Sequence, residues 1–182
     1  MTHKMKYPFV LFITLIGIGS LYGLSVEAST NADTLSRGWQ LTLNQNLTIP
    51  GQSAGVYLQY GKIVDEAEKD QYYANCRLEV RDPHDEPQTV KADTFTVDRV
   101  KWTEDDVSLY TPQYASIHII SAGGATADAY TTTLYLHSDR QPDVTQLICK
   151  HWEDPTGFAE HLSVKQIRDT LGEIFTLLPG NE

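Results

Sequence analysis

Basic residues, cysteines and long apolar runs are all scarce in this sequence. Lys and Arg number 14 against 24 Asp and Glu, which leaves a formal net charge of −10. Nucleic-acid binding draws most of its affinity from neutralised phosphates, so this balance argues against a nucleic-acid partner. After Leu24 no apolar run reaches the roughly 17 residues needed to cross a bilayer, so we expect no transmembrane segment beyond that point.

Several motifs that would name a chemistry are also missing. The sequence has no H-E-x-x-H motif, no C-x-x-C pair and no D-x-[DN]-x-[DN]-G calcium loop. Ser138 stands between His137 and Asp139, but adjacency in sequence does not make a catalytic triad, which is defined by geometry. We therefore expect no catalytic residues and no cofactor, and a hydrolase of unknown type is only the third hypothesis.

The N-terminal residues are arranged as in a secretory signal peptide. The first six residues contain two lysines and no acidic residue, and a mostly apolar stretch follows as far as residue 24. Residues 25–28 then place small side chains where a signal peptidase cuts. We predict a signal peptide over 1–28, a flexible leader over 29–38 and one β-rich domain over 39–182. The mature protein is then periplasmic or secreted. The alternative is an uncleaved segment that anchors it in the inner membrane.

Two cysteines, Cys76 and Cys149, lie more than 70 residues apart. In an oxidising compartment an even number of cysteines predicts a disulfide. In the chain-entropy model, closing a loop of this size stabilises the fold by about 4 kcal/mol. The alternatives are a reactive thiol or a metal-bound thiolate. Neither cysteine has a second cysteine close to it in the sequence, which argues against both alternatives.

Alternation of apolar and polar residues predicts a series of short β-strands separated by turn residues. The segments with this pattern are 39–43, 47–49, 54–60, 72–81, 89–90, 94–102, 115–121, 130–137 and 143–152. We expect an irregularity near Arg99 and a loop at 104–106. We also expect 115–121 and 130–137 to form a hairpin, because Gly and Ala residues separate them.

The periodicity changes near the C-terminus. Ser163 and Gln166 have the spacing of a capping box, in which each side chain bonds the backbone amide of the other residue. Apolar residues then recur at helical spacing, at Val164, Ile167, Leu171 and Ile174. The sequence therefore predicts one short amphipathic helix that packs its apolar stripe on the sheet. Gly172 either ends this helix or lies within it, and Pro179-Gly180 stops it.

Strands followed by a single helix predict a mainly β fold class. We expect a small antiparallel β-sandwich or half-open barrel with one C-terminal helix. No long helix alternates with the strands, which argues against a parallel sheet. About 150 residues bury roughly 70% of their unfolded surface, which is enough for one core.

Two groups of residues are candidates for binding. His151, Glu153 and His161 lie close in sequence and offer the nitrogen and oxygen ligands that zinc accepts. The alternative is a surface loop that precedes the capped helix. A second group consists of tyrosines that could line a ligand surface or simply pack on the sheet. These tyrosines are Tyr57, Tyr60, Tyr72 and Tyr73.

Short segments along most of the chain also suggest a family. They are Ile49-Pro50, Tyr57-Leu58-Gln59-Tyr60-Gly61, Asp70-Gln71-Tyr72, Cys76-Arg77-Leu78-Glu79-Val80, Phe95-Thr96-Val97-Asp98-Arg99-Val100, Gln141-Pro142-Asp143-Val144 and Leu147-Ile148-Cys149. In this order they resemble a family of exported proteins of Gram-negative bacteria that has no assigned activity. The resemblance implies a periplasmic or envelope location and implies no functional residues.

The first functional hypothesis is a non-enzymatic envelope protein, a disulfide-linked β module that binds a protein or a surface component. Its edge strands could accept a strand from a partner. The alternative hypothesis is a periplasmic protein that binds a small ligand or a metal through His151, Glu153 and His161.

Overall fold

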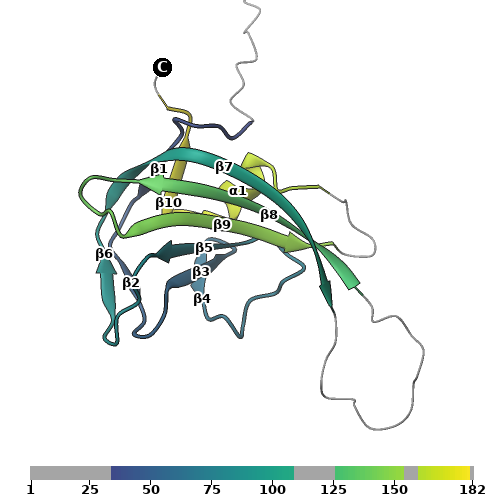
Figure 1. Ribbon diagram of the computed structural model, residues 1–182, viewed down its shortest axis with the longest axis horizontal. Coiled ribbons are helices and arrows are strands. Elements are labelled where there is room, and N and C mark those ends of the chain that lie inside the picture. Colours follow the sequence, from purple (N-terminus) through teal and green to yellow (C-terminus); the bar gives the residue numbers. More distant parts are fainter. Residues whose placement is uncertain (1–33, 109–125, 154–159, 181–182) are drawn as a thin grey trace, which may run out of the picture.

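The structure is a computed structural model that describes residues 34–108, 126–153 and 160–180. Within these ranges eight strands form one antiparallel sheet, and two more strands pair separately. The sheet curls into a half-barrel, and the one helix of the described residues packs against it near the C-terminus (Figure 1). The predicted mainly β fold with one C-terminal helix is confirmed in its half-open-barrel form.

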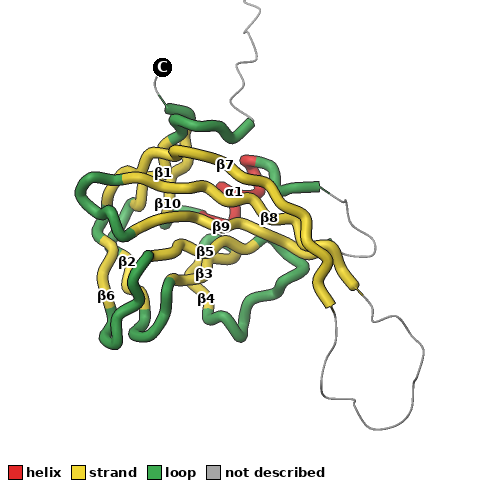
Figure 2. Tube along the Cα trace, in the orientation of Figure 1, coloured by secondary structure: helices red, strands yellow, loops and turns green. Residues whose placement is uncertain are grey.

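The elements follow one another in short steps along the chain (Figure 2). They are β1 (Gln40–Leu43), β2 (Leu47–Ile49), β3 (Gly55–Gln59), β4 (Lys62–Val64), β5 (Asn75–Val80), β6 (Gln88–Val90), β7 (Asp93–Ser108), β8 (Thr126–His137), β9 (Val144–Trp152), α1 (Val164–Leu171) and β10 (Phe175–Leu178). The order in the large sheet is β10, β1, β7, β8, β9, β5, β3 and β4, and β2 pairs with β6.

Alternation along the strands places apolar side chains on the concave face of the sheet. In β5, Cys76, Leu78 and Val80 are buried, while Arg77 and Glu79 between them are half-buried on the other face. Full burial of an aliphatic side chain stabilises a fold by about 1.5–3 kcal/mol. The core therefore lies inside the curl, and the convex face carries polar residues.

Helix α1 begins as the sequence predicts. Ser163 Oγ accepts a hydrogen bond from Gln166 N (3.3 Å), and Gln166 Oε1 accepts one from Ser163 N (2.9 Å). Ile167 and Leu171 are fully buried in the core that the concave face of the sheet lines. The capping box and the apolar stripe are thus confirmed.

The helix touches both ends of the curled sheet, because it packs against β10 on one side and against β3 and β5 on the other. At its C-terminus it meets the tip of the hairpin between β3 and β4, where Gly61 N donates to Thr170 O at 3.0 Å. A Cβ atom on Gly172 would lie only 2.5 Å from Gly61 Cα. Helix α1 therefore bridges the open side of the half-barrel.

Two local predictions are wrong, and a third falls partly outside the described residues. Residues 104–106 belong to β7 and not to a loop. Strand β8 pairs with β7 on one side and with β9 on the other, and residues 115–121 of the expected hairpin lie outside the described residues. Ile174 is not part of the helical stripe, because Gly172 adopts φ +56° and ends the helix. The chain then turns into β10, which the sequence pattern did not indicate, and the short strand β4 was also missed.

Part of the predicted flexible leader over 29–38 packs on the domain. Leu35 is buried, and Gly38 N donates to Val97 O at 2.8 Å. The irregularity expected near Arg99 is confirmed, since the pairing of β7 with β8 shifts register between Val97 and Arg99. No helix in the described part of the chain is long and apolar enough to span a membrane.

Strands β7 and β8 form an arm beyond the curled sheet. Strand β1 pairs with β7 only over its first four residues, opposite Asp93 to Thr96, whereas β8 pairs with β7 as far as Ser108. Strand β9 in turn pairs with β8 only from Ala129 to Tyr135. The far end of the arm is therefore a two-stranded ribbon, visible at the lower right of Figure 1.

Candidate functional site

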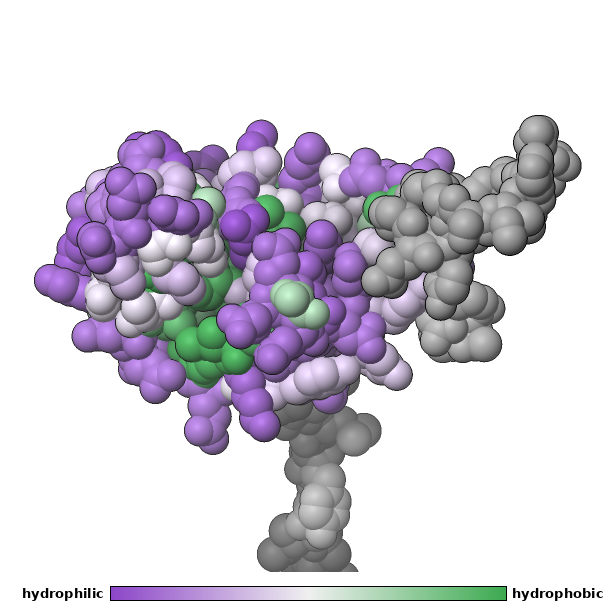
Figure 3. Space-filling view, turned by 90° about the horizontal axis from the view of Figure 1, so that it is seen from below, coloured by the Kyte–Doolittle hydropathy of each residue, from purple (hydrophilic) through white to green (hydrophobic). Residues whose placement is uncertain are grey.

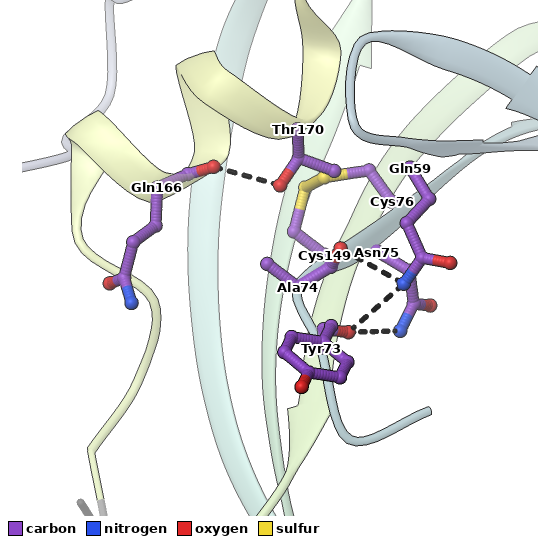
Figure 4. Close-up of a disulfide and its surroundings, with 8 residues drawn as sticks. All are labelled: Gln59, Tyr73, Ala74, Asn75, Cys76, Cys149, Gln166 and Thr170. Atoms are coloured by element: carbon purple, nitrogen blue, oxygen red, sulfur yellow. Dashed lines mark hydrogen bonds between the residues drawn. A yellow bond between two sulfur atoms is a disulfide. The ribbon is translucent and has the colours of Figure 1, made fainter. Parts of the chain in front are cut away.

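The predicted disulfide between Cys76 and Cys149 is present. The two residues face each other across the neighbouring strands β5 and β9, with their Sγ atoms 2.06 Å apart. Both are fully buried, and Thr170 of α1 lies beside the sulfur atoms (Figure 4). The disulfide therefore joins two strands inside the core at the place where the helix covers the sheet.

A buried amide next to the disulfide holds the loop between β4 and β5. Gln59 Nε2 donates to Asp70 O (2.8 Å), and Asp70 N donates back to Gln59 Oε1 (3.0 Å). Asn75 Nδ2 donates to Tyr73 O at 3.0 Å. A buried polar atom that loses its partner costs about 1–3 kcal/mol, so these bonds hold the loop in one position. The loop carries Tyr72 and Tyr73.

An aromatic rim, defined here as Tyr60, Tyr72, Tyr73 and Trp152, lies where this loop meets the hairpin tip. The rings of Tyr60 and Tyr73 have centroids 6.1 Å apart, and Tyr72 meets Trp152 edge to face at 5.7 Å. Tyr60 is 63% exposed and Tyr73 57% exposed. Three of the four tyrosines that the sequence singled out are thus brought together at the surface.

Exposed apolar side chains gather near this rim. Among the described residues, the large apolar or aromatic side chains that are exposed are Tyr60, Ile63, Tyr72, Tyr73, Trp102 and Leu178. Four of these six belong to the β3–β4 hairpin and the loop after it, so this part of the surface differs from the rest. Figure 3, which views the molecule from below, shows a mostly hydrophilic face with several separate hydrophobic areas.

Tyr60 has an unusual backbone for its residue type. It adopts φ +53°, and Gly61 after it adopts φ +72°. Two-residue hairpin loops need positive φ at both positions, and Asn or Gly is preferred there because a Cβ is crowded in that conformation. The chain nevertheless places a large aromatic residue at this position.

The fourth tyrosine, Tyr57, does not belong to the rim. Its hydroxyl donates to Glu66 Oε1 at 2.9 Å on the convex face of the sheet. The Lys69 ammonium lies 4.5 Å and the Arg77 guanidinium 5.2 Å from the centroid of its ring. Tyr57 therefore attaches the acidic loop after β4 to the sheet, which is a structural role.

Lys150 lies on the same convex face. Burial lowers the pKa of its ammonium group, and the nearby cations Lys69 and Arg77 lower it further. Glu66 and Glu79 act in the opposite direction with smaller effects. Three basic side chains are thus held close together, and holding Lys150 charged there costs free energy.

The two histidines of the predicted metal site lie on either side of Tyr130. Its ring stacks on His151 and meets His161 edge to face, with both centroid distances 5.6 Å. Each ring nitrogen of His151 already faces a carbonyl oxygen, Nε2 at 2.7 Å from Glu160 O and Nδ1 at 3.2 Å from Trp152 O. His151 therefore has no nitrogen directed at a common metal position with His161.

The backbone of Glu153 bonds to β8, where Glu153 N donates to Asp128 O at 2.7 Å. No group of three His, Cys, Asp or Glu side chains in the described ranges could hold a metal ion. Burial raises the pKa of the Tyr130 phenol, and Glu153, Asp128 and Glu104 raise it further. Metal binding by His151, Glu153 and His161 stays a prediction without structural support.

Among the described residues, the serine side chains near polar partners do not form a nucleophile site. Ser138 Oγ donates to Asp93 Oδ2 at 2.7 Å, whereas His137 Nε2 lies 3.2 Å from the exposed Asp139. The sequence reasoning overlooked one G-x-S-x-G string, at Gly51 to Gly55. Its serine, Ser53, bonds only the backbone of Gly55, and the string leads into β3 instead of following a strand and opening a helix.

The residues that sequence reasoning missed are the aromatic partners of those it found. Trp152 and Tyr130 occupy β9 and β8, in patterns that sequence reasoning treated as strand packing. The register between β8 and β9 places Tyr130 opposite His151. The sequence alone does not reveal this register. Comparisons with protein-family models, curated proteins and solved structures found no match for this chain.

Proposed function

We propose that this chain is an exported, non-enzymatic module of the Gram-negative cell envelope that binds a protein partner through the aromatic rim. The signal-peptide pattern of residues 1–28 and the resemblance to exported proteins support this location. The disulfide in the core supports it as well, because structural disulfides persist in oxidising compartments.

Tyr60 is the observation that carries the proposal. A left-handed backbone costs about 1 kcal/mol or more for a residue with a Cβ, and Asn or Gly would avoid most of that cost. The side chain is 63% exposed, so it contributes little packing in return. Backbone strain of this kind is concentrated at functional positions, which supports a binding role for an exposed aromatic side chain at this hairpin tip.

The rim is also held rigidly. Trp152 N donates to Gln71 O at 2.8 Å, and Gly61 N at the hairpin tip is bonded to the helix. Tyr and Trp supply large contact areas with few rotatable bonds, which is why they dominate protein interfaces. A pre-ordered rim loses little conformational entropy when a partner binds.

Binding is tested with variants of the rim. Cross-linking of the exported protein in intact cells identifies a partner, which is then purified and titrated by calorimetry. We expect Tyr73→Ala to weaken binding at least tenfold, about 1.4 kcal/mol. We expect Tyr60→Asn to weaken binding similarly while it raises the melting temperature, because Asn tolerates positive φ.

Gln52 provides a matched control. It is exposed and adopts φ +63°, so Gln52→Asn relieves the same kind of strain away from the rim. We expect this variant to gain stability and to bind the partner as the wild type does. Unchanged affinity of Tyr60→Asn would contradict the proposal, and so would exclusive binding to isolated cell-wall or outer-membrane material.

The location is tested separately. Cell fractionation of the full-length chain, with mass spectrometry of its N-terminus, is expected to find a periplasmic or secreted protein that begins at Ser29. A cytosolic protein with residues 1–28 intact and two free thiols contradicts export.

A further inference from the structure

Within the part of the chain that the structure describes, the outer edge of the arm carries unpaired backbone. From Arg99 to Ser108, β7 pairs with β8 on one side, and no strand of the described residues pairs with its other side. An edge of this length presents a row of N–H and C=O groups that can accept another strand. Natural proteins protect such an edge with prolines, bulges or charged side chains, and this segment has no proline and no register shift after Arg99 but does carry charged residues.

Charges along this edge are separated by sign. Arg99 and Lys101 occupy its first part, and Glu104, Asp105 and Asp106 occupy its second part. All five side chains are exposed. A parallel, in-register copy would place like charges side by side, which destabilises a strand pair. An antiparallel copy would instead bring the basic part of one strand against the acidic part of the other.

We propose that two copies of this chain associate through the Arg99–Ser108 edges of their β7 strands, which pair antiparallel about a two-fold axis at Thr103. This register places Lys101 opposite Asp105 of the partner subunit, twice in the symmetric pair. The two sheets then form one continuous sheet across the axis, which is the isologous arrangement of most dimers.

The register satisfies two geometric conditions. Side chains alternate between the faces of a strand, so Lys101 and Asp105 lie on the same face of β7 and meet on that face in the pair. Trp102 lies on the opposite face and is 46% exposed in the single chain. In this register it is the diagonal neighbour of Trp102 of the partner subunit, within reach of an aromatic side chain.

This interface is distinct from the aromatic rim. Strands β8, β9 and β5 stand between β7 and the β3–β4 hairpin in the order of the sheet. A dimer through β7 therefore leaves both rims exposed and presents two binding surfaces to a partner. Dimerisation through β7 does not depend on which partner the rims bind.

The test uses the protein as purified after export, studied by sedimentation equilibrium over a range of concentrations. We expect the wild type to dimerise and the charge reversals Lys101→Glu and Asp105→Lys each to weaken dimerisation at least tenfold, because each replaces two attractive pairs with two repulsive ones. The double variant Lys101→Glu/Asp105→Lys restores opposite charges at both positions and is expected to dimerise like the wild type.

Lys62→Glu is the matched control, since Lys62 is an exposed lysine on β4, the opposite edge of the sheet. It is expected to leave the dimer unchanged, and circular dichroism verifies that each variant is folded. A wild-type protein that stays monomeric at every concentration overturns the proposal. Folded single variants that dimerise normally overturn it as well, and a double variant without rescue overturns the register.

Discussion

The two ends of this sheet are built from similar strands but are supported differently. At the end formed by β3, β5 and β9, the disulfide, helix α1 and the buried Gln59 hold each strand from several sides. In the arm beyond Ala129, β7 and β8 pair with each other and receive one further backbone bond, from Glu153 N to Asp128 O, and Asp105 and Asp106 of β7 are exposed there. Isolated two-stranded ribbons are only marginally stable in water, so neighbours rather than strand propensity set the local stability.

Of the changes considered for the two ends of the sheet, removal of the disulfide is expected to lower the free energy of unfolding most. The double variant Cys76→Ala/Cys149→Ala should lower the free energy of unfolding by about 2–4 kcal/mol, because the unfolded chain loses a cross-link between residues 73 apart. Urea denaturation measures the change. Equal stability of the variant and the wild type would show that the supported end does not depend on the disulfide.

The contact between the hairpin tip and the helix is expected to make the next largest contribution to the free energy of unfolding. Gly172→Ala places a Cβ 2.5 Å from Gly61 Cα at φ +56°, so we expect a loss of about 2–3 kcal/mol from clash and backbone strain together. Gly38→Ala separates the two causes, because Gly38 has φ +91° with no atom within 4 Å of a Cβ. It should cost only about 1 kcal/mol. Similar losses in both variants contradict a specific role for the contact.

Substitution of Lys150 is expected to stabilise the supported end slightly. Because its pKa is lowered in the folded state, the charged form costs free energy at neutral pH. That cost disappears as the pH rises through the lowered pKa toward the ordinary lysine value. Lys150→Met should therefore gain stability at pH 7, within about 1 kcal/mol, and the gain should shrink toward pH 10. A gain that grows with pH would contradict this assignment.

Substitution within the arm is expected to have the smallest effect. Asp106 is exposed, so Asp106→Asn should change the free energy of unfolding by no more than about 0.5 kcal/mol. Amide hydrogen exchange, measured at a dilution where the chain is monomeric, complements this variant, and amides of β7 after Thr103 should exchange faster than those of β5. Equal protection of the two strands would remove the contrast between the two ends.

Much of the fold could be predicted because its signals are local. The capping box of Ser163 and Gln166 and the alternation that turns Cys76 inward are visible in a few consecutive residues. The end of the arm gave no such signal, because residues 104–106 are exposed on a two-stranded ribbon and no apolar face marks them as a strand. Strand β10 depends on a turn at Gly172 that interrupts an apparently continuous helical pattern.

The candidate site was only partly visible in the sequence. Tyr60, Tyr72 and Tyr73 stood out because they are close along the chain, but their separation from Tyr57 follows from the faces of β3. The partnership of Tyr72 with Trp152 joins residues 80 positions apart and depends on strand register. Periodicity reports which face of an element is apolar and does not report which residue lies opposite.

The position of the disulfide also limits which reagents can reach it. Cys76 and Cys149 are neighbours because β9 aligns with β5, although the arm strands separate the two cysteines along the chain. Both sulfur atoms are buried beside α1, so an oxidant or reductant can reach them only if the helix moves away. The bond is therefore shielded from thiol exchange for as long as the C-terminal segment stays in place.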